Sequence, residues 1–248
     1  MEEIRLNKYL AECGICSRRD ADRLVMEGKV TVNGKAAVNG QKVTPNDEIR
    51  VNSKPVKRND KKTVLCYYKP VGVTCTERDE HAKYKITDVI KYPVRITYAG
   101  RLDKDSEGLL ILTNDGDLID RMMRGAGRHE KEYIVKVNKE ITGNFLERMS
   151  AGIYLKDLDT TTRECRIEKE GKFTFRIVLT QGVNRQIRRM CRTLGYEVRM
   201  IKRVRVVNLT LDGLKPGQYR EVKGEALETL YRLTGFGQGN QKGENRNE

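Results

Sequence analysis

The sequence lacks any long apolar run, and this excludes a typical membrane-spanning helix. Its densest aliphatic stretch, Leu109-Leu110-Ile111-Leu112, has the length of a strand, whereas a membrane span needs about 20 apolar residues. The first five residues mix both charges, without the apolar segment of a signal peptide. We therefore expect a cytoplasmic protein that makes no contact with a membrane.

Metal ligands are also scarce. The chain has two histidines, and its six cysteines include a single Cys-x-x-C, formed by Cys13 and Cys16. A zinc site would need two more ligands, and no second pair is present. A reducing compartment disfavours disulfides. We therefore expect no metal and no disulfide, with these two cysteines packed beneath a helix.

Positive charge, in contrast, is abundant. Lys and Arg number 49 against 35 Asp and Glu, which gives a formal net charge of +14. Such an excess favours a polyanionic partner, because cationic patches release counterions from a phosphate backbone. A merely soluble basic protein is the alternative. The length of 248 residues is enough for one large domain or two smaller ones.

Residues 1–52 have the pattern of a small module with two helices followed by short strands. Ser17 and Asp20 have the spacing of a capping box at the second helix, and Asn33-Gly34 predicts a hairpin turn. The first helix carries an apolar face made of Leu6, Tyr9, Leu10 and Cys13. The candidate RNA contacts on the second helix are Arg18, Arg19 and Arg23. A solvated helix face is the alternative for these arginines.

The rest of the chain has three further parts. Residues 53–63 are polar and basic with one proline, the composition of a linker. Residues 64–234 mix strands with fewer helices: 173–180 alternate like a half-buried strand, and 198–207 form a strand rich in Lys and Arg. Residues 235–248 should be a disordered tail. This order predicts the α+β class.

A Gly-flanked polar loop, Gly100-Arg101-Leu102-Asp103-Lys104-Asp105-Ser106-Glu107-Gly108, leads into the aliphatic strand. A carboxylate held at a strand mouth among cations stays ionised, as a nucleophile or a general base must be. The alternative is that the acids of this region only cap turns. We favour turn capping for Asp115, but composition alone does not decide for Asp103.

A second constellation spans residues 182–195 and predicts an amphipathic helix that Gly195 ends. Its apolar stripe consists of Ile187, Met190, Cys191 and Leu194. Arg188 falls at the edge of the stripe, so we expect it to lie half-buried against the sheet, where it would need an anionic partner. A solvated helix leaves the excess of positive charge from 185 to 205 unexplained, since such helices usually mix signs.

These motifs resemble the pseudouridine synthases that modify small- and large-subunit ribosomal RNA (the RsuA/RluB/E/F group). The most specific match is Gly-Arg-Leu-Asp at 100–103 followed by Ser-Glu-Gly-Leu at 106–109. Three further matches are Lys69-Pro70-Val71-Gly72, Lys131-Glu132-Tyr133 and Asn184-Arg185-Gln186-Ile187-Arg188-Arg189-Met190. The last two are most similar to the F-type members, which act on 23S RNA. Residues 1–52 resemble an S-four (alpha-L) RNA-binding domain.

The resemblance implies an enzyme that converts specific uridines of 23S ribosomal RNA into pseudouridine. It also implies that the reaction needs no cofactor. It implies that Asp103 is the catalytic carboxylate, that Tyr133 packs on the target base, and that Arg188 pairs with Asp103. The implied RNA contacts are Arg101, Leu102, Lys104, Val183, Asn184, Arg185 and Gln186. For residues 64–234 it implies a synthase domain with a mixed, mostly antiparallel sheet flanked by helices. We expect a monomer, and transfer RNA stays open as an additional substrate.

Other functions fit parts of the pattern. A non-catalytic RNA-binding or ribosome-assembly protein would share the charge and the N-terminal module, with Tyr133 as an ordinary core aromatic. A glycoside-cleaving hydrolase usually needs two carboxylates roughly 5–9.5 Å apart, and Asp103 with Asp105 or Glu107 could supply them. Free uracil as a product would distinguish the hydrolase.

Overall fold

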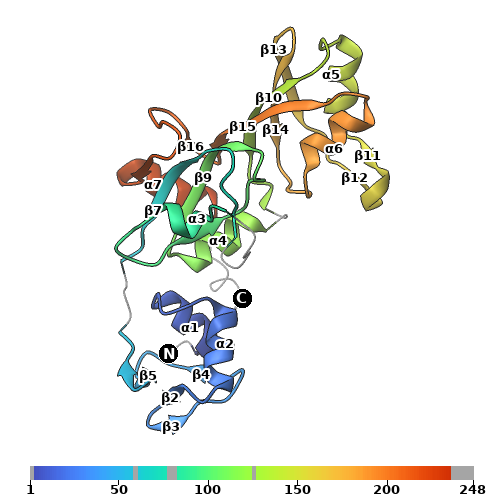
Figure 1. The fold of residues 1–248 in the computed structure, drawn as a ribbon. Helices are drawn as coiled ribbons and strands as arrows, with labels where there is room; N and C mark the ends of the chain where they lie inside the picture. Colours follow the sequence, from blue (N-terminus) through green and yellow to red (C-terminus); the bar gives the residue numbers. More distant parts are fainter. Residues whose placement is uncertain (1–2, 58–60, 77–82, 125–126, 236–248) are drawn as a thin grey trace, which may run out of the picture. The chain divides into compact units, whose positions relative to one another are not determined.

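The computed structural model describes residues 3–57, 61–76, 83–124 and 127–235, which divide into two compact units. The first unit holds the chain up to Thr63 together with Tyr92–Thr97 and Asn114–Gly116, and the second holds the remainder. Of the expected tail 235–248, all but Gly235 lies outside the described residues, as do 58–60 of the expected linker. Figure 1 shows the elements of each unit.

The first unit consists of two short helices and small sheets. Its elements are β1 (Ile4–Arg5), α1 (Leu6–Glu12), α2 (Arg18–Met26), β2 (Val30–Val32), β3 (Lys35–Ala36), β4 (Lys42–Val43), β5 (Ile49–Val51) and β6 (Lys54–Pro55). As the sequence predicts, the hydroxyl of Ser17 caps α2 by accepting a hydrogen bond from the Asp20 amide at 3.2 Å. Asn33 and Gly34 both have positive φ in the β2–β3 turn, the backbone that a two-residue hairpin requires.

The sheet of this unit reaches beyond residue 52. Strand β6 lies within the expected linker, yet it pairs with β5 through Arg50 and Val51. The reason is local: Asn52 and Ser53 adopt positive φ and reverse the chain, and Val56 then packs against the unit's core. The apolar face of α1 is buried in the same core, where Leu10 has no exposed surface.

The second unit is built on a mixed sheet with helices packed against it. Its strands are β7 (Val64–Lys69), β8 (Thr97–Ala99), β9 (Glu107–Thr113), β10 (Lys131–Val137), β11 (Tyr154–Leu155), β12 (Thr160–Thr161), β13 (Arg166–Gly171), β14 (Thr174–Leu179), β15 (Val198–Val206), β16 (Leu209–Thr210) and β17 (Tyr219–Glu221). Its helices are α3 (Ile86–Val89), α4 (Gly116–Met123), α5 (Gly143–Ser150), η2 (Lys156–Leu158), α6 (Gln186–Thr193) and α7 (Gly224–Leu233).

The main sheet has the strand order β13-β14-β10-β15-β9-β7-β17. Its pairs are antiparallel except for β15 and β9, which run parallel. The predicted mixed, mostly antiparallel sheet in an α+β fold is confirmed. Figure 1 shows the long strands β10 and β15 running from one half of this unit into the other.

Each half of the second unit has its own apolar core. In one half α5 and α6 cover β10, β13 and β14, and Phe145, Phe175 and Met190 are fully enclosed. In the other, α4 and α7 cover β7 and β9, both of which are buried on both faces and therefore read as continuous apolar runs. The sheet is shared, so the loops that enter β9 and α6 are anchored on one rigid framework.

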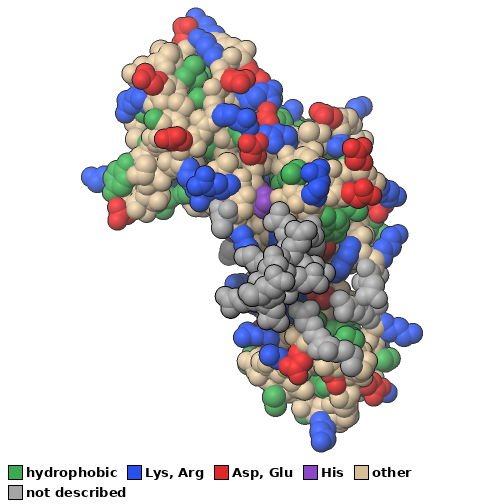
Figure 2. All heavy atoms as spheres, turned by 180° about the vertical axis from the view of Figure 1, so that it is seen from behind, with side chains coloured by type: hydrophobic (Ala, Val, Ile, Leu, Met, Phe, Trp, Pro, Cys, Tyr) green, Lys and Arg blue, Asp and Glu red, His purple; other side chains and the backbone are tan. Residues whose placement is uncertain are grey.

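Charge is distributed rather than gathered into one patch on the face that Figure 2 presents. Basic and acidic side chains are interleaved there, so the net charge of +14 does not by itself locate a binding surface. None of the helices in the described ranges has the length and apolar character needed to cross a membrane.

Candidate active site

A cleft of about 430 Å³ opens in the second unit where segments from distant parts of the sequence meet. Loop 100–106 forms one wall, the turn into α6 forms another, and β10 and β15 supply the floor. The predicted site residues that line it are Arg101, Leu102, Asp103, Lys104, Tyr133, Val183, Asn184, Arg185 and Gln186. The fold thus brings together candidates that lie up to 85 positions apart in the chain.

Asp103 lies in the loop between β8 and β9, and hydrogen bonds hold that loop in place. The Ser106 amide donates to the Asp103 carbonyl at 3.1 Å, and the Gly72 amide donates to the Lys104 carbonyl at 2.8 Å. The second bond ties the loop to the segment Lys69-Pro70-Val71-Gly72, which follows β7. About a third of the Asp103 side chain is exposed (33 %), so its carboxylate faces the cleft rather than the core.

Arg185 is the cation beside Asp103. Its Nη1 lies 3.5 Å from Asp103 Oδ2, and its Nη2 lies 3.1 Å from Asp105 Oδ2. Arg185 caps α6 with a left-handed backbone, φ 50° and ψ 34°, a conformation that a residue with a large side chain adopts only where its surroundings enforce it. This backbone turns the guanidinium toward both carboxylates.

The predicted pair between Arg188 and Asp103 is wrong. Arg188 Nη2 contacts Asp105 instead, at 3.2 Å from Oδ2 and 3.0 Å from the carbonyl oxygen, and it also donates to Ser106 Oγ at 3.3 Å. Arg188 lies almost one turn further into α6 than Arg185, so it reaches the far end of the loop. Its expected half-buried position is confirmed, with 16 % of the side chain exposed.

Asp105 therefore forms the ion pair with Arg188 that the resemblance implies for Asp103. Burial raises the pKa of Asp105, but the hydrogen bond from Arg185 and the charges of both arginines outweigh burial and hold that pKa below its usual value. The two arginines thereby fix the loop that presents Asp103. In this arrangement Asp105 holds the loop in position through its ion pairs, whereas Asp103 lines the cleft.

Two buried cations beneath the loop were missed by sequence reasoning. Lys69 has no exposed surface, and its Nζ donates to the carbonyls of Pro70 at 2.9 Å and Val73 at 2.8 Å. Arg203 is 3 % exposed; its Nε donates to the Leu109 carbonyl at 2.7 Å and its Nη1 to the Arg101 carbonyl at 3.4 Å. The sequence shows Lys69 only as part of a Lys-Pro motif, and Arg203 only as one of several cations in a basic strand.

Gly108 permits the approach of β15 to β9. It has φ +113°, and a Cβ at this position would lie 2.2 Å from the Arg203 carbonyl oxygen and 2.6 Å from the Arg203 nitrogen. The parallel pairing brings Arg203 opposite Gly108. The glycine in the Ser-Glu-Gly-Leu motif is therefore required for close backbone contact, and this contact places Arg203 under the Asp103 loop.

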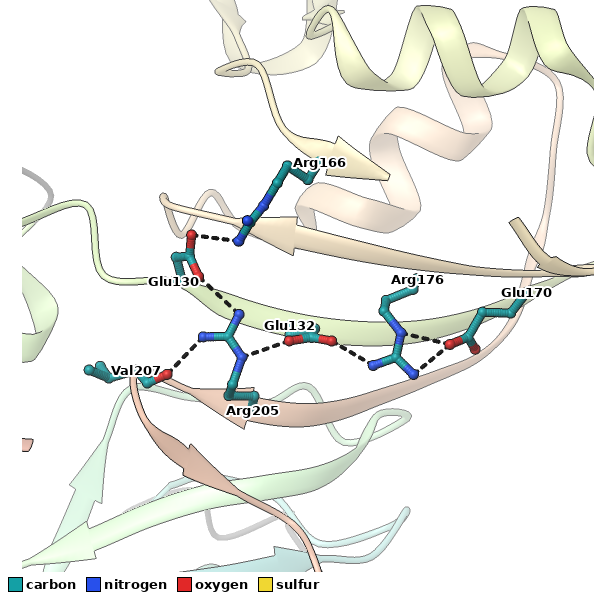
Figure 3. Close-up of polar contacts among 7 residues, drawn as sticks. All are labelled: Glu130, Glu132, Arg166, Glu170, Arg176, Arg205 and Val207. Carbon is teal, nitrogen blue, oxygen red and sulfur yellow. Dashed lines mark hydrogen bonds and ion pairs between the residues drawn. The ribbon is translucent and has the colours of Figure 1, made fainter. Parts of the chain in front are cut away.

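Tyr133 lies on β10 directly opposite Arg203 on β15. Glu132, the preceding residue, points to the other face, as alternation along a strand requires. A register shift between these positions puts Arg205 opposite Glu132. Figure 3 shows the result on the face away from the cleft: Glu132 bridges Arg205 and Arg176, and the chain of ion pairs continues to Glu130 and Glu170.

Three of the predicted RNA contacts belong to the first unit. Arg18, Arg19 and Arg23 are exposed on α2 in the first unit, and Arg23 pairs with Asp20 at 3.0 Å. Cys13 and Cys16 pack against the core of that unit. Within the described ranges, no group of three or more His, Cys, Asp or Glu side chains is arranged to hold a metal ion.

Comparison with known proteins gives two matching family models and several relatives that match more than nine-tenths of this chain. The model described as RNA pseudouridylate synthase matches residues 63–193, and the S4 domain model matches residues 4–49. The dual-specificity RNA pseudouridine synthase RluF of Escherichia coli K12 is 44 % identical over 232 residues, which cover 93 % of this chain and 79 % of that protein.

A second relative and a solved structure agree. The ribosomal large subunit pseudouridine synthase B of Bacillus subtilis is 36 % identical over 239 residues, covering 94 % of this chain and 98 % of that protein. A crystal structure described as a pseudouridylate synthase has a TM-score of 0.68 and 26 % identity, covering 92 % of this chain and 99 % of its own.

Proposed function

We propose that this chain, which belongs to the RNA pseudouridylate synthase family, converts specific uridines of 23S ribosomal RNA into pseudouridine with the Asp103 carboxylate. Family membership makes the chain an RNA pseudouridine synthase, an isomerase with an S4 domain at its N-terminal end. The large-subunit substrate is supported by the similarity to the ribosomal large subunit pseudouridine synthase B of Bacillus subtilis. The cytoplasm, where ribosomal RNA is matured, is the expected compartment.

The observation that carries the proposal is the position of Asp103. Its partly exposed carboxylate faces a cleft of about 430 Å³ that Tyr133 also lines, with the Arg185 guanidinium 3.5 Å away. This volume lies in the range of small-molecule sites and accommodates one nucleoside turned out of its stack. The guanidinium places a positive charge beside the carboxylate that the proposed chemistry uses.

The proposed reaction replaces the bond between ribose C1′ and uracil N1 with a bond between C1′ and C5. Asp103 either attacks C1′ directly or removes the C2′ proton to give a glycal. Tyr133 stacks on the uracil and keeps it in the cleft while it turns. Water must be excluded during this step, since it would trap the ribose and release free uracil. The exchange involves no net redox change, so it requires no cofactor.

A single substitution tests the role of Asp103. We expect Asp103→Asn to fold, to bind unmodified ribosomal RNA as the wild type does, and to form no pseudouridine, because only the ionisable oxygen is lost. Carbodiimide treatment followed by primer extension measures the product. A normal stop at the wild-type position with the variant would refute the role of Asp103.

The matched control is Glu107→Gln, which neutralises another acid of the same motif. The carboxylate of Glu107 accepts a hydrogen bond from the Tyr68 hydroxyl at 3.1 Å, and a glutamine oxygen can accept the same bond. We expect this variant to keep its activity. Release of free uracil by the wild type, together with loss of that activity in both variants, would instead support a hydrolase with two carboxylates.

The range of RNA substrates is tested separately. The Escherichia coli relative is described as having dual specificity for RNA, so ribosomal and transfer RNA from cells lacking this protein should be assayed side by side. Product confined to transfer RNA would contradict the ribosomal assignment. We also propose that the chain acts as a monomer.

A further inference from the structure

Arg203 is a permanently charged side chain buried at the floor of the cleft. It is 3 % exposed and lines the cavity. Its Nε and Nη1 donate to the Leu109 and Arg101 carbonyls, but its Nη2 has no hydrogen-bond partner among the described residues. A guanidinium stays protonated at any accessible pH, and a buried charge without an opposing charge is costly.

Lys131 adds a second cation to the same cavity. Its Nζ donates to the His129 carbonyl at 3.1 Å, and it lines the cleft with Arg203. Burial, followed by the charge of Arg203, lowers the pKa of Lys131. No ion pair joins either cation to a carboxylate of the described chain, because Glu130 and Glu132 are bound to arginines on the other face of the sheet. The cavity floor therefore favours an anion.

The chemistry of the cleft indicates which anion reaches this floor. In both routes open to Asp103, the electron pair of the C1′–N1 bond leaves with uracil, whose negative charge spreads over N1 and the carbonyl oxygens. A backbone phosphate carries a ribose on each side and stays near the mouth of the cleft, whereas the base is the part of a flipped nucleotide that enters deepest. Arg203 also lies directly across the strand pair from Tyr133, where side chains are close neighbours.

We infer that Arg203, with Lys131 beside it, binds the uracil anion that forms when the C1′–N1 bond breaks, and so acts as a catalytic residue of the proposed reaction. The inference rests on the function proposed for the cleft. The C1′–N1 electrons pass to the uracil ring while C1′ bonds to the Asp103 oxygen or, as Asp103 takes the C2′ proton, forms the C1′=C2′ double bond of the glycal. After the ring turns, C5 bonds to C1′ as the C1′–Asp103 bond breaks or, in the glycal, as Asp103 returns the proton to C2′. The C5 proton is then lost, and N1 takes up a proton.

The test compares two substrates under single-turnover conditions with the full-length protein. One ribosomal transcript carries uridine, and the other carries 5-fluorouridine, whose fluorine stabilises the detached base as an anion without help from the protein. We expect Arg203→Gln to lower the rate of C1′–N1 cleavage by about 10²–10³-fold with uridine, and several-fold less with 5-fluorouridine. Nuclease digestion and mass spectrometry follow the loss of the starting nucleoside.

Binding measurements separate this role from phosphate binding. We expect the Kd for RNA and its dependence on salt to match those of the wild type, because the anion appears only during the reaction. A weaker Kd with a salt slope reduced by about one would mean that Arg203 binds a phosphate, and would overturn the inference. Equal losses with both substrates would indicate a purely structural role and would overturn it too.

A second variant covers the case in which Arg203→Gln does not fold. Lys131→Gln should show the same preference for 5-fluorouridine with a smaller loss, and equal losses there would overturn the inference. Arg205→Gln is the matched control, since Arg205 is two residues along β15 on the face that Figure 3 shows, and its rates should match those of the wild type. An inactive wild type would refute the proposed function itself.

Discussion

Glu132 lies between two arginines on the face of the sheet that points away from the cleft (Figure 3). Its oxygens are 2.5 Å from Arg176 Nη1 and 2.6 Å from Arg205 Nε, and 16 % of its side chain is exposed. Burial raises the pKa of Glu132, but the hydrogen bonds and charges of the two arginines outweigh burial and lower it. The ionised form is therefore favoured by folding.

We expect Glu132→Gln to lower the free energy of unfolding by about 2 kcal/mol at pH 7, because two partly buried arginines lose their anion. The folded pKa lies below the unfolded value of about 4.3, so the contribution is complete above that pH and disappears as the pH falls through the folded pKa. Urea unfolding at several pH values measures the difference in the free energy of unfolding between wild type and variant.

The control is Glu168→Gln on β13, which is separated from β10 by β14 and where the carboxylate is exposed. We expect only a small difference between its unfolding free energy and that of the wild type at pH 7, because the side chain is exposed. A gap for Glu132→Gln that stayed constant down to pH 3 would show that the two arginines do not hold its carboxylate ionised.

Single residues also mark the limit of what the sequence predicts. Asp103 and Tyr133 were assigned to one site because their motifs are specific, and the structure brings both to the same cleft. The partner of Asp103 was misassigned, since Arg185 and Arg188 are three positions apart and only the left-handed backbone at Arg185 decides which one faces the carboxylate. Arg203 could not be singled out from the sequence. The strand also carries Arg199, Lys202 and Arg205, and their pattern does not show which of these cations is buried.

Among the elements, the contact of β9 with β15 depends on one missing side chain. We expect Gly108→Ala to lower the free energy of unfolding by at least about 3 kcal/mol, because a Cβ there would lie 2.2 Å from the Arg203 carbonyl oxygen. Thermal and urea unfolding of the purified variant measure the change. Activity should fall with it, since Arg203 and the Asp103 loop meet at this contact.

Gly143→Ala is the control for that substitution. Gly143 is the first residue of α5, and a Cβ there would meet no atom within 4 Å, so stability should be unchanged or higher by up to about 1 kcal/mol. If Gly108→Ala were as stable as Gly143→Ala, β9 and β15 could move apart without a loss of stability, which would contradict this prediction.

Elements with strong local patterns were predicted well. The stripe on α6 is buried as expected, and Gly195 ends the helix with φ +77°. Strand β6 was missed because a two-residue strand has no pattern of its own: Lys54 and Pro55 read as linker, and pairing with β5 alone makes them a strand. The parallel pairing of β9 with β15 was equally hidden, because it joins segments about 95 positions apart.

At the scale of the whole molecule, two units are expected to share the binding of RNA. We predict that replacing Arg18, Arg19 and Arg23 together with Gln weakens RNA binding and makes the plot of log K against log salt shallower by about 2, since each lost phosphate contact removes roughly 0.7 from the slope for single strands. Binding of unmodified ribosomal RNA at several salt concentrations measures this slope.

The control removes the same charge from the same unit. Lys35, Lys42 and Lys54 are exposed on its short strands, and their replacement with Gln should change the salt slope far less. Equal changes in both triple variants would show that the unit attracts RNA only through its overall charge, rather than through contacts made by α2.

The pairing of β9 with β15 also bears on synthesis of the protein on the ribosome. The floor and the reactive loop of the cleft cannot come together until β15 has left the exit tunnel, because β15 is the strand on which the loop rests. Such distant pairings form slowly. A nascent chain is therefore catalytically silent until synthesis has passed well beyond Val206, the last residue of β15, although its first unit can fold long before.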